Sequence, residues 1–280
     1  MKTLPSDRHR IFIVGCARSG TTLLQSILAS NKAIASFPET HFFRGTIPKY
    51  RVLQWFKFYS KKDQEFIKHF LKKIQREDLY KAIPRQTVNT ARWVAEILDL
   101  IDRIPEDNQT TAWIEKTPMH LYFIPLIQHA DPNSKFIHVV REGKDVVASL
   151  YEASQQYPDS FGGKQSVQDC IKRWKRDIKI HKQYINQPNH FYITYNDLLN
   201  NASDAISGLC DFIDVRFSEN MLSFSKKTKV LKFEEEQWKP DSSDEIKATN
   251  KFDTIFSAEQ KEYILTELTS LTLDDFTTSL

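Results

Sequence analysis

Residues 11–28 read IFIVGCARSGTTLLQSIL, and this stretch decides the fold of the chain. The apolar run 11–14 is typical of a short buried strand, which ends at Gly15. Apolar residues then recur at helical spacing from Leu23 to Leu28. A strand, a tight loop and a helix in this order are typical of a phosphate-binding site, because the helix begins with free N–H groups.

Four further apolar segments are typical of strands, and helical patterns lie between them. The expected strands are 34–37, 112–114, 135–140 and 191–194, and the expected helices include 118–127, 144–153 and 166–186. Strands that alternate with helices predict a three-layer α/β fold, in which helices cover both faces of a mostly parallel sheet. We expect one domain over residues 1–280.

Two segments differ from this alternation. Residues from about 49 to 103 show a helical pattern without strands, and they predict a helical insertion between core strands. Residues from about 226 to 256 are polar and charged, so we expect a surface segment that folds over a bound ligand.

Composition limits the classes of function. A hydrophobic content of 40% and a charged content of 27% are ordinary for a soluble globular protein. A net charge of +3 is too small to indicate nucleic-acid binding, but it allows a local basic pocket for a small anion. The sequence has no apolar run long enough to span a bilayer, and its polar amino terminus does not resemble a signal peptide.

The three cysteines, Cys16, Cys170 and Cys210, are far apart and lack the spacing of metal ligands. Reduced structural thiols in a cytoplasmic protein are the expectation. We therefore predict no metal and no membrane insertion, while the oligomeric state stays open.

The loop between the first strand and the first helix contains the groups that hold a phosphate. Gly15 allows the turn, and Gly20 lets the backbone approach the anion. Thr21 and Thr22 offer hydroxyl donors beside the loop amides.

A P-loop small-molecule kinase that uses ATP and Mg is the first alternative. Its loop is Gly-x4-Gly-Lys-Ser/Thr, and here the glycines have that spacing but Thr21 occupies the lysine position. The strand 135–140 is followed by Arg141, where such enzymes usually place a metal-binding Asp. A module that binds the nucleotide without catalysis is the second alternative, and Glu39 and Lys116 argue against it.

The segment Arg-Ser-Gly-Thr-Thr, residues 18–22, resembles the 5′-phosphosulfate loop of sulfotransferases that use 3′-phosphoadenosine 5′-phosphosulfate (PAPS). The resemblance is closest to the bacterial and tyrosylprotein branch. Three further blocks follow in the family's order: WIEKTP at 113–118, VVREGKDVVASL at 139–150 and ITYNDL at 193–198. The resemblance implies a P-loop-like fold, PAPS as sulfuryl donor, and a hydroxyl or amine of a small-molecule or natural-product acceptor.

The resemblance also implies which residues bind PAPS. The expected nucleotide-binding residues are Arg18, Ser19, Gly20, Thr21, Thr22, Arg141, Ser149, Tyr195 and Lys247. Of these, the loop holds the 5′ end, and Arg141 with Ser149 holds the 3′-phosphate. Lys247 and Lys251 are the expected cover over the nucleotide. Arg18 and Lys116 are the catalytic cations, which stabilise negative charge on the leaving oxygen.

The general base is expected just after the second strand. Glu39 is our first candidate, since the tyrosylprotein-like branch has a catalytic glutamate in this region. His41 is the rival base, because soluble eukaryotic members use a histidine. We expect His120 on a helix surface or in the substrate wall, and the acceptor pocket between the insertion and the loop at 157–163.

Overall fold

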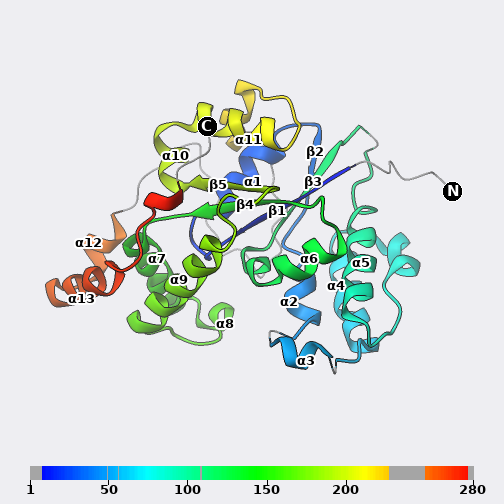
Figure 1. Cartoon of the computed structure of the whole chain (residues 1–280), viewed down its shortest axis with the longest axis horizontal. Coiled ribbons are helices and arrows are strands. Elements are labelled where there is room, and N and C mark those ends of the chain that lie inside the picture. The colour runs from blue at the N-terminus through cyan, green and yellow to red at the C-terminus, as the bar shows by residue number, and fades with distance from the viewer. Residues whose placement is uncertain (1–7, 49, 56, 108, 227–249, 277–280) are drawn as a thin grey trace.

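The computed structural model describes residues 8–48, 50–55, 57–107, 109–226 and 250–276. Five parallel strands form its sheet, in the order β2-β3-β1-β4-β5 (Figure 1). Their bounds are β1 His9–Gly15, β2 Ile34–Ser36, β3 Ala112–Lys116, β4 Lys135–Val140 and β5 His190–Thr194. The α/β fold and all five strands predicted from the sequence are thereby confirmed.

The central strand β1 separates two hydrophobic cores, because successive side chains of a strand point to opposite faces. Ile11 and Ile13 belong to one core, and Phe12 and Val14 belong to the other. The first core is covered by α1 (Thr21–Ala29), α10 (Tyr195–Asn200), α11 (Ala202–Phe212) and η3 (Glu219–Lys226). Figure 1 shows α1 and α11 on one side of the sheet, and α6, α7 and α9 on the other.

The second core is the larger one, and it includes side chains of α2 (Phe42–Thr46), of α4 (Lys61–Lys73) and of the helices named next. They are α5 (Thr90–Ile101), η2 (Pro118–Phe123), α6 (Ile124–Ala130), α7 (Gly143–Gln156), α8 (Pro158–Phe161), α9 (Val167–Lys182), α12 (Lys251–Ile255), α13 (Ala258–Leu268) and η5 (Asp274–Phe276). Trp174 on α9 is buried in this core and fixes the helix to the sheet edge through a hydrogen bond to the Arg141 carbonyl.

The helix expected at 118–127 is a different structure. Pro118 begins a 3₁₀ turn, η2, and the α-helix α6 begins only at Ile124. Pro125 explains the break, because a proline inside a continuous α-helix lacks the N–H group and clashes with the carbonyl one turn earlier.

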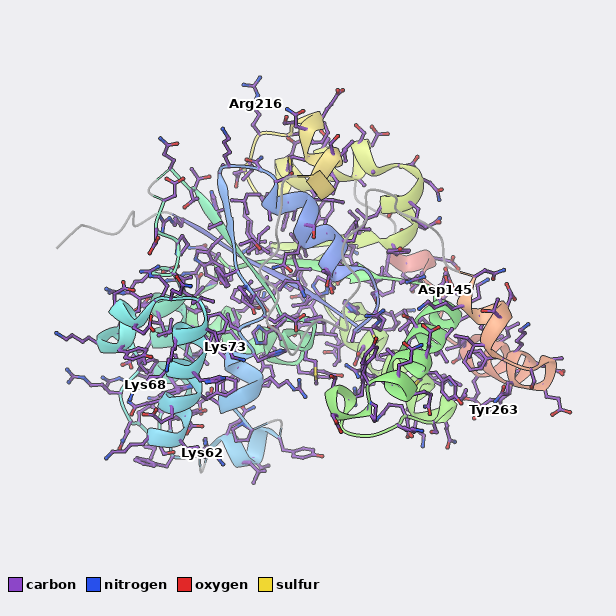
Figure 2. The ribbon with its side chains drawn as sticks, turned by 180° about the vertical axis from the view of Figure 1, so that it is seen from behind. Lys62, Lys68, Lys73, Asp145, Arg216 and Tyr263 are labelled. Atoms are coloured by element: carbon purple, nitrogen blue, oxygen red, sulfur yellow. The ribbon has the colours of Figure 1, made fainter. Side chains whose placement is uncertain are left out.

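The predicted insertion is a set of short helices, namely α3 (Arg51–Trp55), α4 (Lys61–Lys73), η1 (Glu77–Ala82) and α5, preceded by α2 (Phe42–Thr46). A capping box of Ser60 and Asp63 begins α4, whose Lys62, Lys68 and Lys73 are labelled in Figure 2. Tyr59 connects two parts of the insertion, since its ring stacks on that of Trp93 in α5 with 4.6 Å between centroids.

Parallel strands end at the same edge of a sheet, and this edge carries the candidate site. Gly15, Lys116 and Thr194 are the last residues of β1, β3 and β5, and Arg141 directly follows β4. Residues 227–249, with the predicted nucleotide contact Lys247, lie outside the described residues. Lys251 lies within them and forms an ion pair with Glu152 of α7.

Candidate active site

Two positions at and after the end of β1 require glycine, because a side chain there would be too close to neighbouring atoms. A Cβ atom on Gly15 would lie 2.6 Å from the carbonyl oxygen of Val139 on β4. Gly20 has a φ of +99°, and a Cβ there would lie 2.4 Å from the ring of Tyr195. Gly20 therefore lets the loop pack directly against the start of α10, as a left-handed residue without a side chain.

The first turn of α1 lacks a side-chain cap. Gly20 occupies its N-cap position and cannot accept from the free N–H groups that follow. Among the other helices, α4, α5, α9, α10 and α13 begin with a side chain that accepts such a hydrogen bond, whereas α7 and α11 begin without one, as α1 does. Free N–H groups and the positive end of the helix dipole make this turn suited to an anion.

Arg18 is held in an unusual conformation. Its φ is 75°, a left-handed value that costs a non-glycine residue about 1–3 kcal/mol and is often found at functional sites. Its Nε lies 3.0 Å from the Oγ of Ser149 on α7. Its carbonyl oxygen accepts a hydrogen bond of 3.3 Å from Nη1 of Arg141. The structure thus brings Arg18, Arg141 and Ser149 together, whereas the sequence assigns Arg18 to the 5′ end of the nucleotide and Arg141 with Ser149 to its 3′-phosphate.

Tyr195 completes this group. The guanidinium of Arg141 lies over the Tyr195 ring, 4.1 Å from its centroid, so the ring fixes the plane of the cation. Burial and the nearby Arg141 charge lower the pKa of Arg18. The positive charge of Arg141 thus acts unfavourably on that of Arg18, and a bound anion would relieve this repulsion.

Lys116 connects the phosphate-binding helix to the expected base. Its side chain is 3% exposed, and its ammonium forms an ion pair with Glu39, whose side chain is 8% exposed. The same ammonium donates to Oγ1 of Thr22, 3.3 Å away in the first turn of α1. The predicted catalytic residues Glu39 and Lys116 are therefore in direct contact, beside the predicted phosphate site.

His41 contacts the other oxygen of Glu39. Its Nε2 lies 3.4 Å from Glu39 Oε2, and its φ is 53°. Burial lowers the pKa of His41, although the Glu39 charge opposes this shift. The two candidate bases thus form one contact pair, so the geometry alone does not decide between them.

Glu115 is not among the site residues predicted from the sequence. Its carboxylate within the apolar strand 112–116 nevertheless indicates a buried polar contact. It is fully buried and accepts hydrogen bonds from Thr40, Thr117 and His120. The expectation that His120 lies on a helix surface is wrong, because its side chain is also fully buried. The Glu115 carboxylate holds it inside.

Other features concern metals, thiols and membranes. Among the described residues, no group of three or more His, Cys, Asp or Glu is arranged to hold a metal ion. Cys16, Cys170 and Cys210 are free and buried. Within the ranges given above, no helix has the length and apolar character needed to cross a membrane.

The uncapped first turn of α1 lies at the carboxyl edge of a parallel sheet, beside the partly buried Arg18 and the buried Arg141, and this arrangement is typical of α/β proteins that bind phosphate. Residues 10–219 match the Sulfotransferase family. This match spans most of the chain, which belongs to that family. The resemblance found in the sequence is thereby confirmed, and the kinase alternative is disfavoured.

The chain is 25% identical over 215 residues to a protein-tyrosine sulfotransferase of Drosophila melanogaster, a match covering 76% of this chain and 39% of the fly protein. It therefore spans about two fifths of that relative. A solved sulfotransferase domain from the curacin biosynthetic pathway has a TM-score of 0.60 and 19% identity, covering 93% of this chain and 97% of that domain. Mouse sulfotransferase SULT7A1, complexed with PAP, has a TM-score of 0.55 and 11% identity, with coverage of 94% and 83%. The two structural likenesses support the fold.

Proposed function

We propose that this protein transfers a sulfuryl group from PAPS to a hydroxyl or amine of a small-molecule acceptor. The observation that carries the proposal is the position of Lys116, which contacts both Glu39 and Thr22. This arrangement places a buried cation between a carboxylate base and the phosphate-binding turn of α1. Nucleotide binding alone requires neither the carboxylate nor its contact with the cation.

The residues fit a donor with anions at both ends. The uncapped turn of α1, with Ser19, Thr21 and Thr22, would hold the 5′-phosphosulfate end. Arg141 would hold the 3′-phosphate, and Ser149 would add a hydroxyl bond. Tyr195 fixes the plane of the Arg141 guanidinium, which favours a two-point contact with a phosphate.

PAPS supplies the sulfuryl group and releases adenosine 3′,5′-bisphosphate. Arg18 and Lys116 would stabilise the negative charge that develops on the leaving oxygen. Lys116 is already desolvated, so its charge acts more strongly there than a solvated lysine would. Its contact with Thr22 keeps the ammonium at the phosphate-binding turn.

Glu39 would accept the proton of the acceptor. Lys116 contacts Glu39 and would hold its carboxylate beside the first turn of α1. His41 touches the second oxygen of Glu39 and would orient the carboxylate. This assignment makes Glu39 the catalytic base and His41 its neighbour.

The acceptor class is the least constrained part of the proposal. A natural-product alcohol agrees with the likeness in fold to the curacin pathway domain. Its binding site would lie between the insertion, which begins just after Glu39 and His41, and the loop that includes α8. We place the enzyme in the cytoplasm, which agrees with three free cysteines among the described residues.

Nucleotide selectivity tests the proposal. Adenosine 3′,5′-bisphosphate and PAPS should raise the melting temperature in the presence of EDTA, because a ligand that binds the native state stabilises it. At a concentration of 100 times Kd, the stabilisation is about 2.7 kcal/mol. Stabilisation by ATP with Mg²⁺ and none by the bisphosphate would instead support the kinase alternative.

A further inference from the structure

Glu115 is a buried charge inside the sheet. It lies on β3 directly before Lys116, and its side chain is 0% exposed. A buried carboxylate is costly unless hydrogen bonds replace the water that it loses. The environment of Glu115 therefore has to supply donors, and their positions indicate what the charge does.

Five donors contact the two carboxylate oxygens. Oε1 accepts from the backbone N of Thr40 at 3.1 Å, from its hydroxyl at 3.0 Å and from the hydroxyl of Thr117 at 2.6 Å. Oε2 is 3.1 Å from the backbone N of Thr117 and 2.7 Å from Nδ1 of His120. Burial raises the pKa of Glu115, but His120 and these hydrogen bonds outweigh it and hold that pKa below its ordinary value.

The donors belong to the two segments that carry the proposed catalytic groups. Thr40 lies between Glu39 and His41, in the loop that follows β2. Glu115 and Thr117 are the two neighbours of Lys116 at the end of β3. A second bond joins the same segments, because the backbone N of His41 donates to the Thr117 hydroxyl at 3.3 Å.

We propose that Glu115 is a positioning residue, which fixes the loop of Glu39 to the strand end of Lys116 and thereby sets the contact between base and cation. The predicted effect of Glu115 on turnover rests on the proposed function, whereas its structural role does not. Glu115 does not face the acceptor or the nucleotide in this proposal, because its two oxygens already accept hydrogen bonds from protein donors. Its role is therefore to hold Glu39 and Lys116 in place.

Substitution of Glu115 by Gln tests this role. Gln keeps the shape but has one oxygen, and its NH₂ group would face donors that it cannot satisfy. We expect kcat to fall about 100-fold, the effect of a displacement on the order of 1 Å at a reacting group. The Kd for adenosine 3′,5′-bisphosphate should stay within about threefold, a change below 1 kcal/mol. A variant that keeps kcat within about threefold, measured below its melting temperature, overturns the proposal.

Thr40 provides a milder test that does not depend on the folding of the Glu115 variant. The Thr40 hydroxyl donates to Glu115 and accepts from the backbone N of Phe42 at 3.3 Å. Thr40→Val removes both bonds at nearly constant volume, whereas Thr40→Ser retains them. We expect kcat to fall about tenfold in the Val variant and to recover with Ser, because loss of the hydroxyl bond to Glu115 lets the Glu39 loop move relative to Lys116. Equal defects in both variants would contradict the role assigned to the hydroxyl bond.

Thr46→Val is the matched control. Thr46 is similarly buried in α2, and its hydroxyl bonds to Phe42 and Trp93 without touching Glu115. The Thr46→Val variant should have a lower melting temperature and an unchanged kcat. This result would show that loss of stability alone does not reduce turnover. A loss of kcat equal to that of Thr40→Val would overturn the proposal.

A crystal structure of Thr40→Val gives a readout that requires no activity. The proposal predicts a longer separation between Glu39 and Lys116, and an unchanged contact would overturn it. A wild-type protein without any sulfuryl transfer would refute the proposed function, while this structure would still decide the positioning role.

Discussion

Arg18 and Ser149 are 131 residues apart in the sequence, yet Nε of Arg18 lies 3.0 Å from Oγ of Ser149. One residue belongs to the loop after β1, and the other lies on α7. Their contact connects the group predicted for the 5′ end of the nucleotide with the group predicted for its 3′-phosphate. The two predicted anion sites are therefore parts of one continuous surface at the carboxyl edge of the sheet.

Arg141→Ala should weaken the binding of adenosine 3′,5′-bisphosphate by one to two orders of magnitude. The reason is the loss of a charge-assisted hydrogen bond worth about 1.5–3 kcal/mol. Isothermal titration calorimetry measures this Kd directly. Arg216→Ala, an exposed arginine beyond α11 (Figure 2), serves as the control for the loss of one positive charge. An equal loss of affinity in the two variants would remove Arg141 from the site.

Glu39→Gln should abolish most transfer while nucleotide affinity stays intact. A positioned base contributes about 10²–10⁴-fold to the rate, and Gln retains the shape of Glu but cannot accept the proton. His41→Ala should reduce the rate much less. Steady-state kinetics on both variants check the assignment, which fails if His41→Ala is inactive and Glu39→Gln is active at normal PAPS affinity.

The buried ion pair of Glu39 and Lys116 predicts how substitutions at the two positions change the free energy of unfolding. Removal of one partner of such a pair costs roughly 3–5 kcal/mol, because the remaining charge stays buried. We therefore expect both Glu39→Gln and Lys116→Met to lower the free energy of unfolding by this amount. The double variant should lose less than the sum of the two. Urea unfolding of the four proteins gives the coupling, and strict additivity would show that the pair contributes no stability.

A cluster of three histidines predicts a loss of stability in mild acid; His138 and His181 are fully buried, and His190 is partly buried. Nδ1 of His138 lies 2.7 Å from Nδ1 of His181, and its Nε2 lies 2.7 Å from Nδ1 of His190. Burial lowers the pKa of His181 to about 3 and that of His190 to about 4. Burial, followed by the charges of the other two, also lowers the pKa of His138.

Below about pH 6.5 the unfolded chain therefore binds protons that the folded cluster does not, and the free energy of unfolding falls as the pH falls toward 4. For fully buried His181, the slope is about 1.4 kcal/mol per pH unit. His181→Gln should reduce the slope by about this amount in urea titrations between about pH 4 and 5.5, where the unfolded histidine is protonated and the folded one is not. An unchanged slope in the variant would contradict this account.

Local sequence patterns predicted the sheet correctly because each strand is a short apolar run between turn signals. The loop residues 18–22 were also predictable, since glycine spacing and helix start are local properties. Pro125 is also a local signal, because it indicates a break within the helix expected over 118–127. An uninterrupted helical pattern does not by itself exclude a break at a proline.

The contacts between distant segments were less predictable. In the sequence, Glu115 is a single charged residue within a strand. The tertiary structure shows that Thr40, 75 residues earlier, donates a hydrogen bond to it. The direct pairing of Glu39 with Lys116 likewise depends on how the loop after β2 meets the end of β3. Hydrophobic periodicity specifies which face of a strand is buried, but it does not specify which polar groups meet there.

Transfer from PAPS to an acceptor panel tests the central claim most directly. The panel comprises natural-product alcohols, sugars, lipids, amines and a tyrosine peptide, incubated with labelled PAPS in EDTA and followed by mass spectrometry. We predict that at least one small-molecule acceptor gains one SO₃ group, and that Glu39→Gln and Lys116→Met each lose most of this activity. Phosphorylation of the same acceptors from ATP with Mg²⁺, or full sulfuryl transfer by both variants, would contradict the account.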